Sequence, residues 1–126
     1  MKSLVLVVDD NHDNVNVVRE ILLPHGFDVE VAYDGPGALA SIERRRPNVI
    51  LLDVMMPGMS GLEVLDRIRG NPAYATIPVV LLTAKAQDQD LLEGYRVGAD
   101  YYITKPFTPR QVLYGIGLVL GQEAPA

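Results

Sequence analysis

The chain alternates short apolar runs with longer amphipathic stretches. Apolar runs rich in β-branched residues are typical of strands that are buried on both faces of a sheet. Three such runs lie at residues 3–8, 48–52 and 78–82. Residues 28–33 alternate polar and apolar side chains, which predicts a strand at the sheet edge, and residues 99–104 form a weaker candidate. The pattern therefore predicts five strands.

The amphipathic stretches between these runs predict helices. They lie at residues 12–23, at 38–46, after Ser60, at 88–97 and after Thr108. Asp34, Ser60 and Thr108 are of the types that cap helix N-termini, because their side chains accept hydrogen bonds from free backbone N–H groups. Glu63 and Gln111, three residues after Ser60 and Thr108, complete two capping-box patterns.

A strand followed by a helix, repeated along the whole chain, is typical of an α/β protein with a parallel sheet and right-handed crossovers. In such a fold, helices cover both faces of the sheet. A chain of 126 residues is long enough for one domain with its own hydrophobic core. We expect residues 1–121 to form that domain and residues 122–126 to be a flexible tail or the start of a linker.

Composition and charge remove several classes of function. A hydrophobic content of 48% with 21% charged residues indicates a globular chain. The absence of cysteine excludes disulfides, thiolate nucleophiles and cysteine-rich metal sites. With 11 basic and 16 acidic side chains the net charge is −5, which argues against direct nucleic-acid binding. The apolar runs are far shorter than the roughly 20 residues of a membrane span, and the N-terminus does not resemble a signal peptide, so we expect a cytoplasmic protein without membrane contact.

Polar side chains follow four of the predicted strands at the point where each strand ends. Asp9 and Asp10 follow the first strand, Asp53 the third, Thr83 the fourth and Lys105 the fifth. The carboxyl ends of parallel strands lie at one edge of the sheet, where ligands bind in open α/β folds. We therefore expect three carboxylates, a hydroxyl and an ammonium group to face one crevice.

Three carboxylates in one crevice need positive charge. Two of them about 4 Å apart repel each other by about 4 kcal/mol at an effective dielectric constant of about 20. Lys105 supplies a single positive charge. A hard divalent cation fits the remaining deficit, and oxygen ligands without nearby His or Cys favour Mg²⁺ over Zn²⁺. Taken one at a time, each residue also has a structural interpretation, such as an Asp that caps a helix; their joint position favours a functional site.

These residues resemble the receiver domain of two-component response regulators. The resemblance rests on Asp9-Asp10, the run from Asp53 to Gly58 with Gly61, Thr83-Ala84, and Lys105-Pro106-Phe107. It extends over nearly the whole chain, from Leu4 to about Leu120. It implies a (βα)5 doubly wound three-layer sandwich, with a five-stranded parallel sheet of order 2-1-3-4-5.

The resemblance also implies a phosphoacceptor and a metal site. Asp53 matches the aspartate that takes a phosphoryl group from the phosphohistidine of a sensor histidine kinase or a phosphotransfer protein. Asp9, Asp10, Asp53 and the backbone carbonyl of Met55 match the ligands of Mg²⁺ or Mn²⁺. The chain would then be no conventional enzyme, but a phosphoacceptor that promotes its own phosphorylation and autodephosphorylation.

The remaining matched residues imply contacts to the phosphoryl group and a conformational switch. Lys105, the Thr83 hydroxyl and the Ala84 amide would contact phosphoryl oxygens, and the Lys105–Pro106 bond would be cis. Thr83 and Tyr102 match the switch pair, which makes the fourth helix, the fifth strand and the last helix a signalling face. That face would act on a downstream protein target or an attached output domain, or support a phosphorylation-dependent dimer.

Three alternatives belong to other classes. A phosphatase of the haloacid dehalogenase type also forms an aspartyl phosphate, but it needs a second Asp where Met55 stands. A flavodoxin-like FMN protein needs a phosphate-binding loop rich in Ser, Thr and Gly, whereas residues 9–13 are acidic and would repel phosphate. The more serious alternative is a binding module that keeps the fold but signals without phosphorylation, although every matched position is intact. A nucleotide hydrolase is excluded because the chain has no G-x-x-x-x-G-K-[ST] signature.

Overall fold

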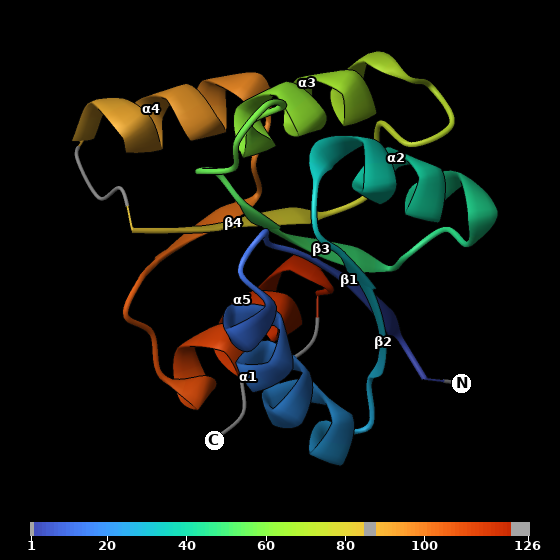
Figure 1. Cartoon of the computed structure of the whole chain (residues 1–126), viewed down its shortest axis with the longest axis vertical. Coiled ribbons are helices and arrows are strands. Elements are labelled where there is room, and N and C mark those ends of the chain that lie inside the picture. Colours follow the sequence, from blue (N-terminus) through green and yellow to red (C-terminus); the bar gives the residue numbers. More distant parts are fainter. Residues whose placement is uncertain (1, 85–87, 122–126) are drawn as a thin grey trace.

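A parallel sheet forms the centre of the chain in this computed structural model, which describes residues 2–84 and 88–121. The strands of these residues are β1 (Leu4–Val8), β2 (Asp28–Ala32), β3 (Val49–Asp53), β4 (Val79–Thr83) and β5 (Tyr101–Thr104). Their order across the sheet is β2-β1-β3-β4-β5 (Figure 1). All neighbouring pairs are parallel. The predicted fold class and strand order are confirmed.

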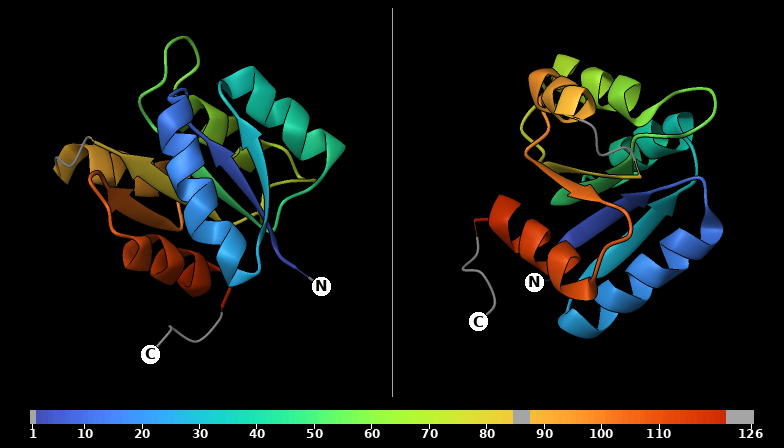
Figure 2. Two further views of the ribbon diagram at one scale, coloured as in Figure 1. Left: turned by 60° about the horizontal axis from the view of Figure 1, so that its bottom comes forward. Right: turned by 90° about the vertical axis from the view of Figure 1, so that its left-hand side faces the viewer.

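Helices cover both faces of this sheet. They are α1 (His12–Leu22) with a short 3₁₀ helix η1 (Leu23–His25), α2 (Gly35–Arg44), α3 (Gly61–Gly70), α4 (Asp88–Val97) and α5 (Pro109–Val119). Helices α1 and α5 lie on one face, and α2, α3 and α4 lie on the other (Figures 1 and 2). No helix within the described residues is both long and apolar enough to cross a membrane. The predicted tail, residues 122–126, lies outside the described part.

Local sequence signals explain where the helices begin. Asp34 caps α2 by accepting a hydrogen bond from the Gly37 N–H over 2.6 Å. Thr108 and Gln111 form the reciprocal capping box predicted for α5, with distances of 3.2 and 2.7 Å. Each such cap satisfies backbone donors that the first turn of a helix leaves free. Asn11, which the sequence pattern did not single out, caps α1 in the same way.

The predicted helix over residues 38–46 is displaced toward the N-terminus and spans Gly35–Arg44. It begins earlier because Asp34 caps it directly and Pro36 fits the first helical turn, where no N–H is needed. It ends earlier because Arg45 is extended, with φ −150° and ψ 108°. Pro47 disfavours a helical conformation in the residue before it, so the helix ends ahead of that proline.

The inner strands are buried on both faces. Successive side chains of β1 enter two different cores: Leu6 and Val8 lie among side chains of α2 and α3, whereas Val5 and Val7 lie among those of α1 and α5. Each fully buried Val or Leu contributes about 1.5–3 kcal/mol relative to an exposed one. The two cores therefore fix the inner strands, and with them the positions of the residues at their carboxyl ends.

The first residue of α3 lies directly against the end of β3. The Gly61 N–H donates to the Val54 carbonyl over 3.0 Å. A Cβ atom on Gly61 would collide with the backbone carbonyl of Asp53. Because that obstacle is backbone, it cannot move aside as a flexible side chain would. Glycine at this position therefore allows α3 to start immediately behind the polar edge of the sheet.

We predict that Gly61→Ala destabilises the fold by about 1–3 kcal/mol, because the added methyl group overpacks against fixed backbone. Gly70→Ala is a matched control in the same helix, since a Cβ on Gly70 would meet nothing within 4 Å. It should leave stability unchanged or raise it by up to about 1 kcal/mol. Urea unfolding of both variants measures the difference. Equal stability of the two variants would contradict the packing argument.

Candidate functional site

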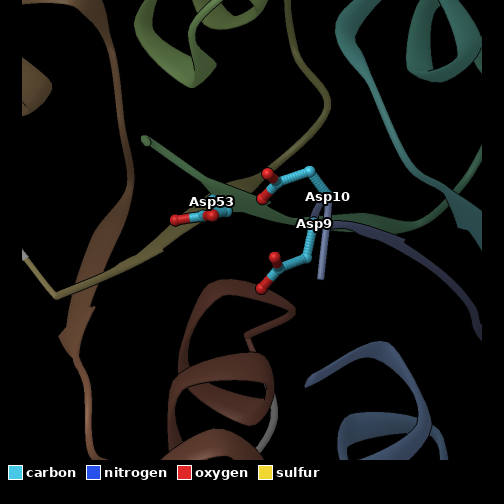
Figure 3. Close-up of side chains that lie close together, drawn as sticks. All are labelled: Asp9, Asp10 and Asp53. Carbon is cyan, nitrogen blue, oxygen red and sulfur yellow. The ribbon is translucent and has the colours of Figure 1, made fainter. Parts of the chain in front are cut away.

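The strand order brings three aspartates together at the carboxyl edge of the sheet. Asp9 and Asp10 directly follow β1, and Asp53 is the last residue of the neighbouring strand β3. One carboxylate oxygen from each of the three lies within 4.8 Å of the others. Figure 3 shows the three side chains converging from the two strand ends. Asp9 and Asp53 are buried, whereas Asp10 is exposed.

Thr83, the last residue of β4, and Lys105, directly after β5, lie at the same edge. The Lys105 ammonium lies 2.9 Å from Asp9 Oδ2 and 3.8 Å from Asp53 Oδ1. The Lys105 backbone N–H donates to the Thr83 carbonyl over 2.8 Å, and the Thr83 side chain is fully buried. The Lys105–Pro106 peptide bond is cis, as the resemblance implies.

Asp9 is held by several donors. Its Oδ1 accepts from the Asn11 N–H over 3.0 Å, and its Oδ2 accepts from the Asn14 side chain over 3.4 Å in addition to Lys105. Asn14 was not predicted as a site residue. Its place within the first turn of α1, close behind Asp9 in the sequence, is the only signal that could have indicated this contact.

The surroundings of Asp53 disfavour its ionised form. The pKa of its carboxyl group is raised from 3.8 to about 6, first by burial and second by the negative charge of Asp9. Lys105 and the Met55 N–H, which donates to Asp53 Oδ1 over 3.3 Å, lower the same pKa. Because Asp9 affects this pKa more strongly than Lys105 does, Lys105 alone does not balance the negative charge beside Asp53.

The donor set fits a hard divalent cation. All three clustered side chains offer carboxylate oxygens, which are the ligands that Mg²⁺ and Mn²⁺ prefer. Apart from burial, the negative charges of Asp9 and Asp10 raise the pKa of Asp53, and a cation held here would oppose them. The exposed Asp10 leaves the cluster open to solvent, so that a cation can reach it. These residues therefore could hold Mg²⁺.

The other predicted site residues are Met55 and Ala84, which follow β3 and β4, and Tyr102, which lies within β5. Met55 is in the loop after β3, with its side chain 53% exposed. Ala84 is exposed directly after Thr83. Tyr102 is half-buried in β5 and packs against the core shared by α2, α3 and α4, whereas Tyr101 packs against the opposite core. The two adjacent tyrosines thus point to opposite faces of the sheet, as a strand requires.

The strand order and the acidic edge define the doubly wound class of α/β domain. A family model for the response regulator receiver domain matches residues 5–116. The chain belongs to this family, and it is a receiver domain of the kind found in two-component response regulators.

Individual relatives and structures agree with this assignment. The chain is 38% identical over 120 residues to the sensory transduction protein RegX3 of Mycolicibacterium smegmatis, covering 95% of this chain and 51% of that protein. It is 40% identical over 113 residues to the DNA-binding response regulator MtrA of Mycolicibacterium paratuberculosis, covering 90% and 49%. The chemotaxis protein CheY4 of Vibrio cholerae superposes with a TM-score of 0.90 at 35% identity, covering 94% of this chain and 99% of CheY4.

We predict that Asp53→Asn stabilises the metal-free protein at neutral pH but not in acid. The folded-state pKa of Asp53 is raised, so its contribution to stability is present below about pH 3.8 and is lost as pH rises through about 6. Asn cannot ionise, so the variant should gain about 1–3 kcal/mol over the wild type above pH 6. Urea unfolding in EDTA from pH 4 to pH 8 measures this gain. A stability difference that does not change with pH would contradict the prediction.

Proposed function

We propose that Asp53 is the phosphoacceptor of this receiver domain. It would take a phosphoryl group from the phosphohistidine of a sensor histidine kinase or a phosphotransfer protein. The observation that carries this proposal is the buried Asp53 carboxylate, clustered with two further carboxylates and lying 3.8 Å from the Lys105 ammonium. This arrangement combines a nucleophile with positive charge for phosphoryl oxygens, and phosphoryl transfer depends mainly on positioning and charge neutralisation.

In the proposed reaction, an oxygen of the Asp53 carboxylate attacks phosphorus while the phosphorus–nitrogen bond to the histidine breaks. The product is an acyl phosphate, and the electron pair of the broken bond returns to the imidazole of the donor. The attacking carboxylate must be ionised, and with a pKa of about 6 most of Asp53 is ionised at neutral pH. Asp9, Asp10, Asp53 and the Met55 carbonyl would hold Mg²⁺ or Mn²⁺, which supplies positive charge to phosphoryl oxygens when bound.

Lys105, Thr83 and Ala84 would contact the transferred group. The Lys105 ammonium lies between Asp9 and Asp53 and can act as a point charge on one phosphoryl oxygen. The Thr83 hydroxyl and the Ala84 N–H would bind another oxygen, and the small Ala84 side chain leaves room for the incoming group. By the same contacts the domain would assist autodephosphorylation, so we describe it as a self-assisting phosphoacceptor and not as a conventional enzyme.

We predict that acetyl phosphate with Mg²⁺ adds one phosphoryl group to the wild-type chain and none to Asp53→Asn. Intact-mass spectrometry measures the product, and EDTA in place of Mg²⁺ should reduce phosphorylation about 10-fold or more, because charge neutralisation is lost. Gly70→Ala serves as a control that leaves the site intact. Phosphorylation of Asp53→Asn to the wild-type level would contradict the assignment of the phosphoacceptor.

The output of phosphorylation would pass through Thr83 and Tyr102. An acyl phosphate brings about two negative charges to the end of β3 and can draw the Thr83 hydroxyl toward it. Tyr102 lies beside Leu81 in the sheet and against α4 at Gly94, where an added Cβ would be 3.5 Å from the tyrosine ring. A groove of about 810 Å³ between α4, β5 and α5 is lined in part by Tyr102. We propose this face as the signalling surface.

We predict that Thr83→Ala separates phosphorylation from the switch. The variant should still gain a phosphoryl group on Asp53, because the attacking carboxylate and Lys105 remain. The change in the Tyr102 backbone amide shift on phosphorylation should fall by about half or more, because the link that biases the two conformations is lost. Two-dimensional NMR before and after acetyl phosphate measures it. A Tyr102 response equal to that of the wild type would contradict the role of Thr83.

Partners and location extend the same proposal. The chain spans about half the length of the curated relatives that it matches. We propose that it signals either to an attached output domain or to a separate protein target, with a phosphorylation-dependent dimer as one form of that output. We propose a cytoplasmic location and no direct contact of this domain with nucleic acid, which the net charge of −5 supports.

A further inference from the structure

The side chain of Arg69, near the end of α3, joins several segments at the sheet edge remote from the acidic cluster. Its Nε donates to the Gly98 carbonyl over 2.9 Å. Its Nη1 donates to the carbonyls of Ile77 and Ala75 over 2.7 and 3.3 Å. Its Nη2 donates to Asp100 Oδ2 over 2.9 Å. The guanidinium therefore holds together the end of α4, the approach to β4 and the start of β5.

Asp100 extends this connection to the strands. The carboxylate oxygen that accepts from Arg69 also accepts from the Val79 N–H over 2.8 Å. The Asp100 N–H donates to the Val79 carbonyl over 2.9 Å. The Arg69 side chain is only 20% exposed, so these charge-assisted bonds are partly shielded from water. Arg69 and Asp100 together fix the starting points of β4 and β5 relative to α3.

Gly98 fits the end of α4 closely against the guanidinium. Its φ of +122° is a conformation that residues with a side chain rarely adopt. A Cβ atom at this position would lie 3.0 Å from Arg69 Nε and 3.1 Å from Arg69 Cγ. Both the backbone conformation and the available space therefore require glycine, and they bring the Gly98 carbonyl to the Arg69 donor.

The anchored elements carry the proposed switch and site residues: Thr83 and Lys105 lie at or just past the other ends of β4 and β5, and Tyr102 lies within β5. Strand β4 begins at Val79 and ends at Thr83, and β5 contains Tyr102 and leads to Lys105. Helix α3 begins at Gly61, against the backbone of Asp53, and carries Arg69 next to its last residue. Arg69 thus holds the remote ends of elements whose near ends surround the phosphoacceptor.

We propose that Arg69 is a positioning residue of the switch. By fixing the end of α4 and the starts of β4 and β5, it confines the conformational response to phosphorylation to the ends of these elements near Asp53. This inference rests on the proposed phosphoacceptor role of Asp53. The planar guanidinium, with donors in several fixed directions, can bond Gly98, Ile77 and Asp100 at once, which a lysine ammonium on a flexible stem cannot do equally well.

The test is amide hydrogen exchange on the full chain, with and without Mg²⁺ and beryllofluoride as a phosphoryl mimic. In the wild type, we expect beryllofluoride to change exchange at residues 102–105 and to leave residues 95–101 unchanged. In Arg69→Met, which keeps the aliphatic stem, residues 95–101 should exchange about 10-fold faster and should become responsive to beryllofluoride. Arg69→Lys should restore part of the wild-type pattern.

Arg96→Met is the matched control. Arg96 is also an arginine in an ion pair at the end of α4, but its partner is Glu93 in the same helix and its side chain is 76% exposed. This variant should behave as the wild type does. If Arg69→Met does not fold, Asp100→Asn replaces it, and the same response at residues 95–101 is expected. If the role of Arg69 is purely structural, Arg69→Met lowers stability, but beryllofluoride changes exchange at the same residues as in the wild type.

Two results would overturn the proposal: a beryllofluoride response at residues 95–101 of the wild type as large as that at 102–105, or an Arg69→Met pattern identical to that of the wild type. Failure of the phosphoacceptor role has a different signature. In that case intact mass shows no phosphoryl group on Asp53 in any variant, and beryllofluoride changes exchange nowhere. The wild type would then show no change in exchange at residues 102–105, and this result would also reject the role of Arg69.

Discussion

Repulsion among like charges is the constraint on which this structure depends. Asp9 and Asp53 are buried within a few ångströms of each other, although separated carboxylates in water would be more stable. The hydrophobic cores on the two faces of the sheet hold β1 and β3 side by side, and so hold these two residues together. Lys105 offsets only part of the repulsion, because its effect on the pKa of Asp53 is smaller than that of Asp9, and burial raises this pKa as well. The free energy gained by packing the two cores thus outweighs the repulsion between these carboxylates, and the resulting acidic pocket attracts cations.

The architecture was predictable because its signals are local. Apolar runs indicated the three inner strands, alternation indicated β2, and β5 was a weaker candidate. Side chains such as Asp34 and Thr108 indicated where helices begin. The alternation of strands and helices then implied a parallel sheet, in which polar residues at strand ends converge. The positions of Asp10, Asp53 and Lys105 at one edge followed from that topology. The strand order itself came from the family resemblance, since periodicity alone does not determine it.

Contacts between side chains far apart in the sequence were not predictable in the same way. Nothing local to Arg69 indicates that it bonds to the carbonyl of Gly98 or to Asp100, because those bonds depend on how α3 packs beside α4. The bond from Asn14 to Asp9 likewise depends on the angle at which α1 leaves β1. Boundaries were also imprecise: Asp53 and Thr83 are the last residues of their strands, one position beyond the predicted ends.

The strand positions of Thr83 and Lys105 have a mechanical consequence. The backbone hydrogen bond between them continues the ladder of β4 and β5 to the rim of the pocket. The Thr83 hydroxyl and the Lys105 ammonium come from separate segments, and the backbones that carry them are joined by hydrogen bonds. A displacement of the Thr83 end of β4 would therefore also shift the base of the Lys105 side chain, and the hydroxyl and ammonium groups would keep their spacing.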